Sequence, residues 1–287
     1  MEISQELKDL AKTIYKEKCI CLLAPSFVVD FKYPKMVVEL RRIGFNKVTE
    51  LTYAAKLISK KTHDVIKKNK SKQYICSNCP TIVSIVENQH PEIKKNIINI
   101  ASPMVLMARF MKQKYPGYKT VFVGPCFSKK QEASKTKDVD YAITFKEMND
   151  IFNYSKKNKF YKKKEKEKNT FDKFYNDVTK IYPLSGAVAE TINTRNILDW
   201  KEILVADGPL EIPNAFKKFK KDKNIRFLDI LFCKGGCVGG PGIMSYETIE
   251  QREDRVIHYR DKCKKEKIGK NFGKFKYSNG LKFDRVK

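Results

Sequence analysis

Five of the eight cysteines fall into a pattern that could bind metal. They are Cys76-x-x-Cys79, the isolated Cys126, and Cys233-x-x-x-Cys237. Thiolates ligate zinc in four-cysteine sites and also hold iron–sulfur clusters, so the spacing alone leaves both chemistries open. Because reducing compartments keep thiols free, cysteines of an intracellular chain are more often metal ligands or catalytic groups than disulfides.

The residues around these cysteines favour a cluster over zinc. The candidate ligands lie in turns rich in proline and glycine, with the sequences CSNCP, GPCFSKK and CKGGCVGGPG. Such turns let the backbone approach a sulfur closely and leave N–H groups free to donate to it, which tunes a reduction potential. A zinc ribbon usually pairs two short knuckles, whereas one cysteine here stands alone in a Pro-Cys turn.

At these segments the sequence resembles the catalytic domain of the iron-only hydrogenases, in particular a divergent minimal or sensory-type branch without N-terminal ferredoxin domains. The family signature T-S-C-C-P is similar to CSNCP at 76–80, and P-C-x-x-K-x-x-E is matched by PCFSKKQE at 125–132. The third signature, C-x-x-x-C followed by glycines, is matched by CKGGCVGG at 233–240. The resemblance extends over about residues 20–260, through segments such as ENQHPEI and PLSGAVAETI.

The resemblance implies an H-cluster, in which one cysteine sulfur joins a 4Fe-4S cubane to a diiron centre with CO and CN ligands. Cys79, Cys126 and Cys233 would anchor the cubane, and Cys237 would bridge it to the diiron centre. The implied activity is that of an iron-only hydrogenase-like oxidoreductase: reversible oxidation of H2 or reduction of protons. The implied partners are ferredoxin or a similar acidic electron carrier and dedicated hydrogenase maturation proteins.

The resemblance also implies which residues surround the diiron centre. Lys129 would donate to one cyanide, and the loop formed by Ala24, Pro25 and Ser26 would line the second. Pro103 and Gly186 would shape the same pocket. Among acidic residues, Glu132 has a clear match in the family pattern.

The proton relay departs from the family pattern. The position of the relay cysteine is Asn78, whose amide cannot gain and lose a proton near neutral pH. The relay serine is replaced within 97–99, the outer glutamate has no equivalent in AAKLISKK, and Gly124 replaces a pocket methionine. Cys76 would serve only if its loop turned it inward. An alternative therefore stays open: a catalytically weak or inactive 4Fe-4S relative that acts in iron–sulfur assembly or in redox or H2 sensing.

The segments that carry these residues follow the pattern of an α/β fold. Short apolar runs alternate with segments of helical periodicity, which predicts parallel sheets with crossover helices. Four runs, CLLAPS, YICSNCP, VFVGPC and RFLDILFC, end on a candidate site residue, and ligands of such sheets bind beyond the carboxyl ends of the strands. We predict helices near 2–17, 34–43, 53–68, 80–88, 102–114, 210–221 and 247–262, and further strands near 46–51, 72–76 and 119–124.

We expect a single cluster domain over 1–287, with two lobes and the metal cluster buried between them. Lobe one would span about 18–154 and lobe two about 177–262. Residues 155–176, dense in lysine and glutamate, are expected to form a solvated insertion. A basic tail would follow from 263 to 287.

The formal net charge of +26 could attract nucleic acid, anionic lipid or an acidic protein. Lysine accompanies asparagine and isoleucine throughout, which is typical of compositional bias on a solvated surface. No nucleic-acid-binding motif is recognisable, so nucleic acid is not favoured, although a four-cysteine zinc protein with a nucleic-acid-binding surface remains a third hypothesis.

The sequence shows no signal peptide and no apolar run of bilayer length, which predicts a soluble cytoplasmic protein without membrane association. Cys19, Cys21, Cys263 and the three histidines are expected to be ordinary structural or surface residues.

Overall fold

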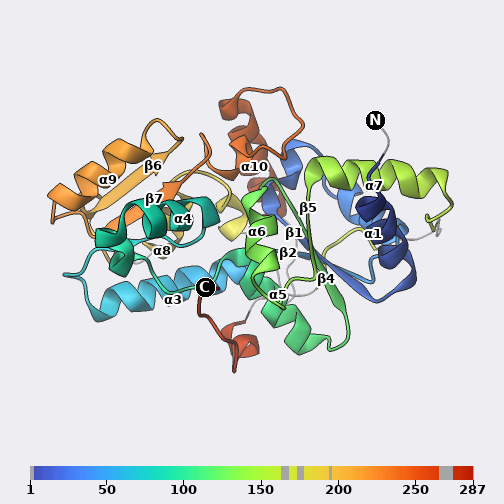
Figure 1. Cartoon of the computed structure of the whole chain (residues 1–287), viewed down its shortest axis with the longest axis horizontal. Helices are drawn as coiled ribbons and strands as arrows, with labels where there is room; N and C mark the ends of the chain where they lie inside the picture. The colour runs from blue at the N-terminus through green and yellow to red at the C-terminus, as the bar shows by residue number, and fades with distance from the viewer. Residues whose placement is uncertain (1–2, 163–167, 173–177, 194–195, 265–273, 287) are drawn as a thin grey trace.

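Two separate parallel sheets form the framework of the chain. The computed structural model describes residues 3–162, 168–172, 178–193, 196–264 and 274–286. One sheet has the strand order β2-β1-β4-β5 and the other has the order β3-β7-β6. All neighbouring strands pair in parallel. The two sheets follow one another along the long axis of the molecule, each with its own helices (Figure 1). The predicted α/β class, with parallel sheets and flanking helices, is confirmed.

The four-stranded sheet consists of β1 (Cys19–Leu23), β2 (Lys47–Glu50), β4 (Lys119–Gly124) and β5 (Tyr141–Thr144). All five residues of β1 are buried, because a strand inside a parallel sheet is covered on both faces. The helices of this part are α1 (Gln5–Lys16), α2 (Lys35–Arg42), α5 (Pro103–Lys114), α6 (Ser128–Ser134) and α7 (Phe145–Lys157). Helix α5 packs on β1 and β4, and α1 packs on α7.

The three-stranded sheet consists of β3 (Tyr74–Ile75), β6 (Ile203–Asp207) and β7 (Phe227–Leu231). Its helices are α3 (Thr52–Lys68), α4 (Pro80–Gln89), α8 (Ala187–Ile192) and α9 (Ile212–Lys221). Strand β3 comes from the N-terminal half of the chain and pairs with β7. The sheets therefore do not follow the predicted lobe boundaries, because residues inside 18–154 complete the second sheet.

Local signals explain where most elements begin. The Ser102 side chain caps α5, and Pro103 occupies its first turn, where a missing N–H costs nothing. Helix α7 begins with a reciprocal capping box between Thr144 and Glu147. The predicted helices near 53–68 and 102–114 agree with α3 and α5 to within one residue. The sequence patterns missed β5, which has four residues and only two buried ones.

Most described residues of the predicted insertion are exposed, as a solvated segment requires, but the segment is attached to the body at its end near Phe171. Phe171 is buried against Phe27, with ring centroids 6.1 Å apart. The carboxylate of Asp172 pairs with Arg41 at 2.9 Å and accepts from the N–H of Val48 at 2.8 Å. Residues 163–167 and 173–176 of that range lie outside the described residues. One aromatic ring and one carboxylate thus attach this segment to the four-stranded sheet.

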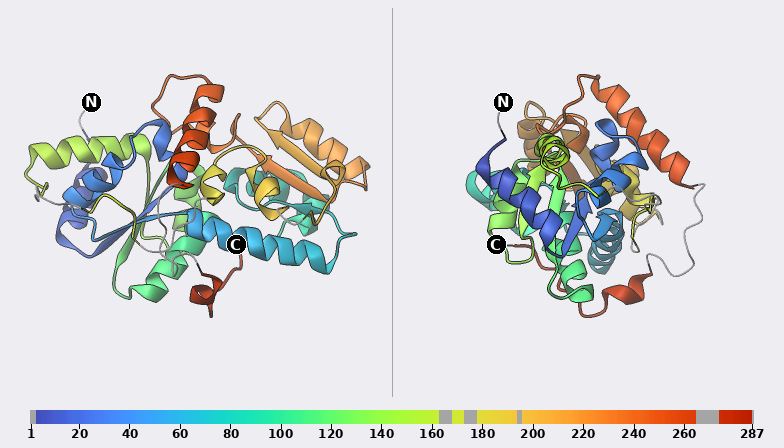
Figure 2. Two further views of the ribbon diagram at one scale, coloured as in Figure 1. Left: turned by 180° about the vertical axis from the view of Figure 1, so that it is seen from behind. Right: turned by 90° about the vertical axis from the view of Figure 1, so that its right-hand side faces the viewer.

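The C-terminal part returns to the body of the protein. Helix α10 (Ile249–Lys264) packs on the 3-10 turns η1 (Pro25–Val29) and η3 (Val178–Ile181). Farther on, the carbonyl of Phe283 accepts from the N–H of Ala101 at 2.7 Å, and Arg285 pairs with Glu87 at 2.8 Å. Residues 265–273 of the predicted basic tail lie outside the described residues. Figure 2 shows this last segment beneath the body, on the side opposite α10.

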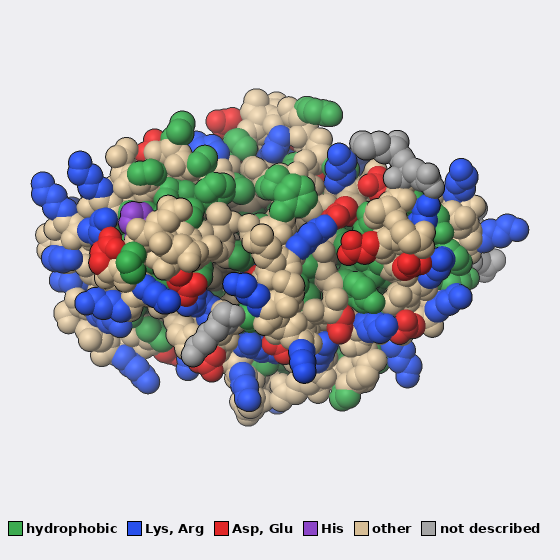
Figure 3. Space-filling view, viewed as in Figure 1, with side chains coloured by type: hydrophobic (Ala, Val, Ile, Leu, Met, Phe, Trp, Pro, Cys, Tyr) green, Lys and Arg blue, Asp and Glu red, His purple; other side chains and the backbone are tan. Residues whose placement is uncertain are grey.

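Lysine and arginine side chains are spread over the whole face shown in Figure 3, with aspartate and glutamate among them. This distribution agrees with a solvated basic surface and differs from the single stripe that tracks a nucleic-acid backbone. None of the helices in the described ranges is long and apolar enough to cross a bilayer.

Candidate metal centre

The ends of strands from both sheets meet at one cavity of about 90 Å³. Its walls include residues that directly follow β1, β2 and β4, together with Leu231 at the end of β7. Asn78 and Cys79, in the loop after β3, complete the side toward the smaller sheet. The carboxyl ends of parallel strands are the usual place for a ligand in such folds, and here two sheets supply them.

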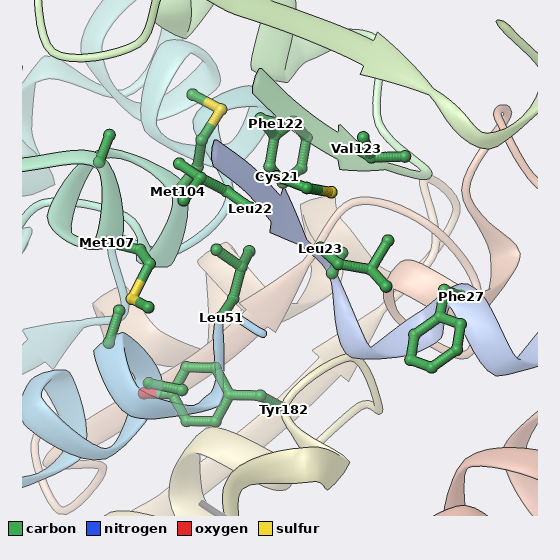
Figure 4. Close-up of a cluster of buried hydrophobic side chains, with 14 of the residues drawn as sticks. Cys21, Leu22, Leu23, Phe27, Leu51, Met104, Met107, Phe122, Val123 and Tyr182 are labelled. Carbon is green, nitrogen blue, oxygen red and sulfur yellow. The ribbon is translucent and has the colours of Figure 1, made fainter. Parts of the chain in front are cut away.

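Most of the residues predicted for the site lie on this cavity. The predicted residues that line it are Ala24, Pro25, Ser26, Asn78, Cys79, Pro103, Cys126, Lys129 and Cys237. Sequence reasoning missed the remaining wall, which is mainly apolar and consists of Leu51, Ala55, Pro80, Met104, Phe122, Pro125, Tyr182, Pro183, Val188 and Leu231. Figure 4 shows Leu51, Met104 and Phe122 in one apolar cluster with the side chains of β1.

The four predicted ligands form one electrostatically coupled group. A thiolate at Cys126, Cys79 or Cys233 would raise the pKa of Cys237. A thiolate at Cys79 or Cys126 would likewise raise the pKa of Cys233. Burial raises the pKa of Cys233 to about 12 and also raises the pKa of Cys79 and of Cys237. Enclosed thiols of this kind lose their protons when metal binds, since the metal supplies the missing positive charge. The four thiols are neighbours, as a shared metal assembly requires.

The thiols are not arranged as a compact site for one ion. Within the described ranges, no group of three or more His, Cys, Asp or Glu residues could hold a metal ion. Around a single zinc, with Zn–S bonds of about 2.3 Å, tetrahedral geometry would place the sulfurs only about 3.8 Å apart. A cubane carries each cysteine on a different corner iron and accepts a wider arrangement.

Cys79 lies at the N-terminus of α4, with Pro80 in the first turn. The backbone N–H groups of Ile82 and Phe232 donate to its sulfur and lower the pKa of Cys79, although burial raises that pKa more strongly. The first N–H groups of a helix have no partner within the helix, so they favour a negatively charged group at this position. This environment suits a thiolate that ligates iron, because amide donors to the sulfur tune the potential of a cluster.

Glycines orient the loop that carries Cys237. Gly235 and Gly236 have φ of +71° and +82°, a conformation that other residues rarely adopt. A Cβ atom on Gly236 would lie 2.5 Å from the carbonyl oxygen of Pro183, so a side chain would not fit. The N–H of Cys237 donates to the same oxygen at 2.6 Å, and the N–H of Gly235 donates to Asp207 Oδ1 at 3.0 Å. The CKGGC loop is thereby fixed with Cys237 on the cavity.

Lys129 lies in the first turn of α6 with its side chain 11% exposed. Its ammonium donates to Glu132 Oε2 at 2.7 Å and to the carbonyl oxygen of Asn78 at 3.3 Å. Ser102 Oγ donates to the same oxygen of Glu132 at 2.8 Å. Glu132 therefore stands behind Lys129 and does not itself line the cavity. The pair holds a cation at the cavity wall.

Two polar atoms on the cavity lack a protein partner. They are Ser26 Oγ and Asn78 Nδ2, both buried. Buried polar groups are rarely left unpaired, and such atoms commonly mark a site for water or a bound group. Both can donate hydrogen bonds, as can the Lys129 ammonium. Three donors in an otherwise apolar wall, beside four thiols, fit a cluster that bears small anionic ligands.

Residues 17–241 match the family described as "Iron only hydrogenase large subunit, C-terminal domain". The chain belongs to this family.

Individual relatives differ in how much of the chain they resemble. Iron hydrogenase 1 of Clostridium pasteurianum is 25% identical over 259 residues, which cover 72% of this chain and 45% of that protein. The cytosolic Fe-S cluster assembly factor NAR1 of Kluyveromyces lactis is 37% identical over 76 residues, 25% of this chain and 16% of that protein. The chain therefore spans less than half the length of these two relatives.

The fold agrees with solved hydrogenase structures. A variant of the FeFe-hydrogenase HydA1 from Chlamydomonas reinhardtii superposes with a TM-score of 0.63 and 15% identity, over 88% of each chain. At this level of identity the likeness concerns the fold.

Some family positions behave differently from expectation. Gly186 does not line the cavity; it has a φ of +77° at the start of α8, where it turns the chain toward Val188, which does line it. Cys76 is buried but is absent from the cavity wall, so the loop does not turn it inward. Burial raises the pKa of Cys76 strongly. Cys76 therefore does not lie where the sequence analysis required it to lie for a role in a proton relay.

Proposed function

We propose that this chain holds a 4Fe-4S cluster through Cys79, Cys126, Cys233 and Cys237 and a diiron centre in the adjoining cavity, and that it interconverts H2 with protons and electrons. The observation that carries this proposal is that Cys79, Cys126 and Cys237 line one cavity together with Lys129, and that Cys233, which does not line it, interacts electrostatically with the same thiols. The membership in the iron-only hydrogenase family supports it.

When bound, the metal group supplies redox-active irons and an open coordination position for H2. The protein residues bind this group, orient it and exclude water. The Lys129 ammonium, fixed by Glu132, would donate to a ligand on one side, and Ser26 Oγ and Asn78 Nδ2 would donate on others. The apolar wall would keep the site dry, which strengthens each of these contacts.

Electrons would pass between the cluster thiolates and a protein carrier at the surface. All four candidate ligands are partly exposed, and Phe127, next to Cys126, is 53% exposed. A net charge of +26 favours an acidic carrier, ferredoxin or a protein of similar chemistry. We propose a cytoplasmic location, and we propose that maturation proteins insert the diiron part.

A second candidate is a 4Fe-4S protein without H2 chemistry, acting in iron–sulfur assembly or in sensing. Two observations favour it. The chain is 37% identical to the assembly factor NAR1 over 76 residues, and an amide that cannot relay protons occupies position 78. In this case the four thiols would serve as before, and the cavity would contain no diiron centre.

Maturing the protein together with hydrogenase maturation enzymes tests the proposal. We expect infrared bands of CO and CN ligands, iron in excess of four atoms per chain, and H2 evolution from reduced viologen. A brown protein with about four irons and no such bands would favour the second candidate. Zinc without visible absorption would overturn both.

Replacement of Cys237 sharpens this test. Cys237→Ala should abolish the infrared bands and the H2 chemistry, because this sulfur is expected to join the two parts of the cluster. Cys21→Ala is the matched control, since Cys21 is a fully buried thiol on β1 and does not line the cavity. H2 evolution at full rate in Cys237→Ala would contradict the assignment.

A further inference from the structure

A chain of buried hydroxyl groups begins at the cavity wall and leads away from it. Tyr182 lines the cavity together with Asn78. Ser59 Oγ donates to the Tyr182 hydroxyl at 3.2 Å, and Ser59 Oγ lies 3.0 Å from Thr191 Oγ1. Figure 4 shows the Tyr182 oxygen directed toward the ribbon of α3, on which Ser59 lies. All three side chains are buried.

The three hydroxyls come from three different segments. Ser59 belongs to α3, Thr191 belongs to α8, and Tyr182 directly follows η3. Helix α3 packs on both α8 and η3, which brings the three together in an otherwise apolar contact. Phenylalanine, alanine and valine would have similar shapes at these positions without needing any hydrogen bond, so a continuous polar chain here is a notable departure from apolar packing.

The outer end of this chain approaches a histidine. His63 lies one helical turn after Ser59 on α3, on the same side of the helix. Its Nδ1 atom is 3.1 Å from the carbonyl oxygen of Ile192, the residue after Thr191. His63 is partly exposed, whereas Ser59 and Thr191 are buried. Thr191, the outer member of the chain, thus lies one residue before the carbonyl group that the partly exposed imidazole contacts.

The geometry at the inner end suits transfer toward the cavity. Since Ser59 donates to Tyr182, the phenolic proton is free to point elsewhere, and the side chain of Asn78 adjoins the hydroxyl. Burial raises the pKa of Tyr182, so the phenol keeps its proton at neutral pH. A hydroxyl can accept one proton and donate its own in the same event, and therefore it relays a proton without ionising.

Other ionisable groups near Tyr182 are less suited to this role. Cys76 and Asp229 both interact electrostatically with it. Cys76 is buried away from the cavity wall, and Asp229 Oδ2 accepts from the N–H of Ala189 at 2.8 Å. The hydroxyl chain, in contrast, includes a residue, Tyr182, that lines the cavity.

We propose that Thr191, Ser59 and Tyr182 relay protons between the surface near His63 and the cavity, in place of the relay side chain missing at Asn78. The inference rests on the proposed function. In the inward direction a proton binds Thr191 Oγ1, and the Thr191 hydroxyl turns from the carbonyl oxygen of Val188, to which it donates at 3.0 Å, toward Ser59. The proton of Thr191 then moves to Ser59 Oγ, and that of Ser59 moves to the Tyr182 oxygen. The phenolic proton then leaves into the cavity, and rotation of the hydroxyls restores the chain. Oxidation of one H2 sends two protons outward by the reverse transfers and two electrons to the acidic carrier.

Tyr182→Phe in the matured protein tests the relay, because it removes the hydroxyl and keeps the ring in the cavity wall. We expect unchanged iron content and unchanged positions of the CO and CN infrared bands. The rate at which these bands respond to a pH jump should fall at least about tenfold, and H2 evolution should fall in parallel. Reduction of the cluster by dithionite, which requires electrons alone, should keep its rate.

Two further variants make the result unambiguous. Ser59→Ala interrupts the chain without touching the cavity wall and should slow the same response, also if Tyr182→Phe fails to incorporate the cluster. Tyr74→Phe is the matched control, because the Tyr74 hydroxyl donates to the backbone oxygens of Val65 and Asn69 and Tyr74 does not line the cavity. It should behave as the parent protein.

The failures of the two proposals are distinguishable. Absence of CO and CN bands in the parent protein would overturn the proposed function, and the relay would fall with it. Normal bands with an equally fast pH response in Tyr182→Phe and Ser59→Ala would overturn the relay alone.

Discussion

Two lysine–glutamate pairs in this chain have similar lengths and different surroundings. Lys129 and Glu132 are 2.7 Å apart at the edge of the cavity, with side chains 11% and 12% exposed. Lys180 and Glu50 are 2.6 Å apart in the core, where both side chains are completely buried. The first pair is close to the proposed metal centre, and the second lies between η3 and the end of β2.

The core pair is part of a closed network. The Tyr259 hydroxyl donates to Glu50 Oε1 at 2.7 Å, and Thr52 Oγ1 donates to Glu50 Oε2 at 3.0 Å. The Lys180 ammonium also lies 4.3 Å from the centroid of the Tyr259 ring. Lys129 instead faces the cavity with part of its donor capacity. The Lys180 ammonium therefore joins segments of the core, whereas the Lys129 ammonium remains available to a ligand.

The largest expected effect comes from breaking the core pair. Lys180→Ala should lower the free energy of unfolding by about 3–5 kcal/mol, because Glu50 would keep a buried charge without its partner. Urea denaturation at pH 7 measures this. The double variant Glu50→Gln/Lys180→Met should recover a large part of the loss, since it removes both charges and retains volume. A loss below about 1 kcal/mol in Lys180→Ala would show that the pair does not organise the core.

A buried carboxylate without a lysine sharpens the comparison. Asp229 is 1% exposed, its Oδ1 atom has no hydrogen-bond partner, and burial raises its pKa to about 6. Between about pH 4 and pH 6 the folded state binds more protons than the unfolded state, so stability contributed by this group falls as pH rises.

Asp229→Asn should remove that pH dependence. The free energy of unfolding of the variant, relative to that of the parent protein, should increase by about 2–3 kcal/mol between pH 4 and pH 7, because only the parent must ionise a buried carboxyl. Denaturation curves at both pH values provide the difference. An equal stability difference at the two pH values would mean that Asp229 ionises in the fold as easily as in the unfolded chain.

The smallest effect on stability is expected at the cavity. Lys129→Ala should lower the free energy of unfolding by only about 1 kcal/mol, since both side chains keep some contact with solvent and Glu132 keeps its bond from Ser102. In the matured protein the same variant should change the CN infrared bands, because a donor to the ligand is lost. Lys60→Ala, in the exposed pair with Asp64, is the control for a simple loss of charge. A destabilisation equal to that of Lys180→Ala would remove the distinction between the two pairs.

The motifs of the sequence predicted much of the site because each is a short segment tied to a strand end. An apolar run followed by a Pro- or Gly-rich turn predicts where a strand stops, and four such runs carried Ser26, Cys79, Cys126 and Cys233. Helical periodicity predicted elements such as α3 and α5 nearly to the residue. These signals are local, so the sequence by itself determined the α/β class, and the resemblance of its motifs to a known family supplied the candidate ligands and Lys129.

Only the tertiary structure decided which of these segments meet. The pairing of β3 with β7, the burial of Phe171 and the absence of Gly186 from the cavity wall depend on contacts between residues far apart in the chain. The Glu50–Lys180 pair and the contact of the Ser59 hydroxyl with Tyr182 also depend on such distant contacts. No local sequence pattern marks these residues. A local pattern indicates that a side chain is buried, but its partner is set by the packing of whole elements.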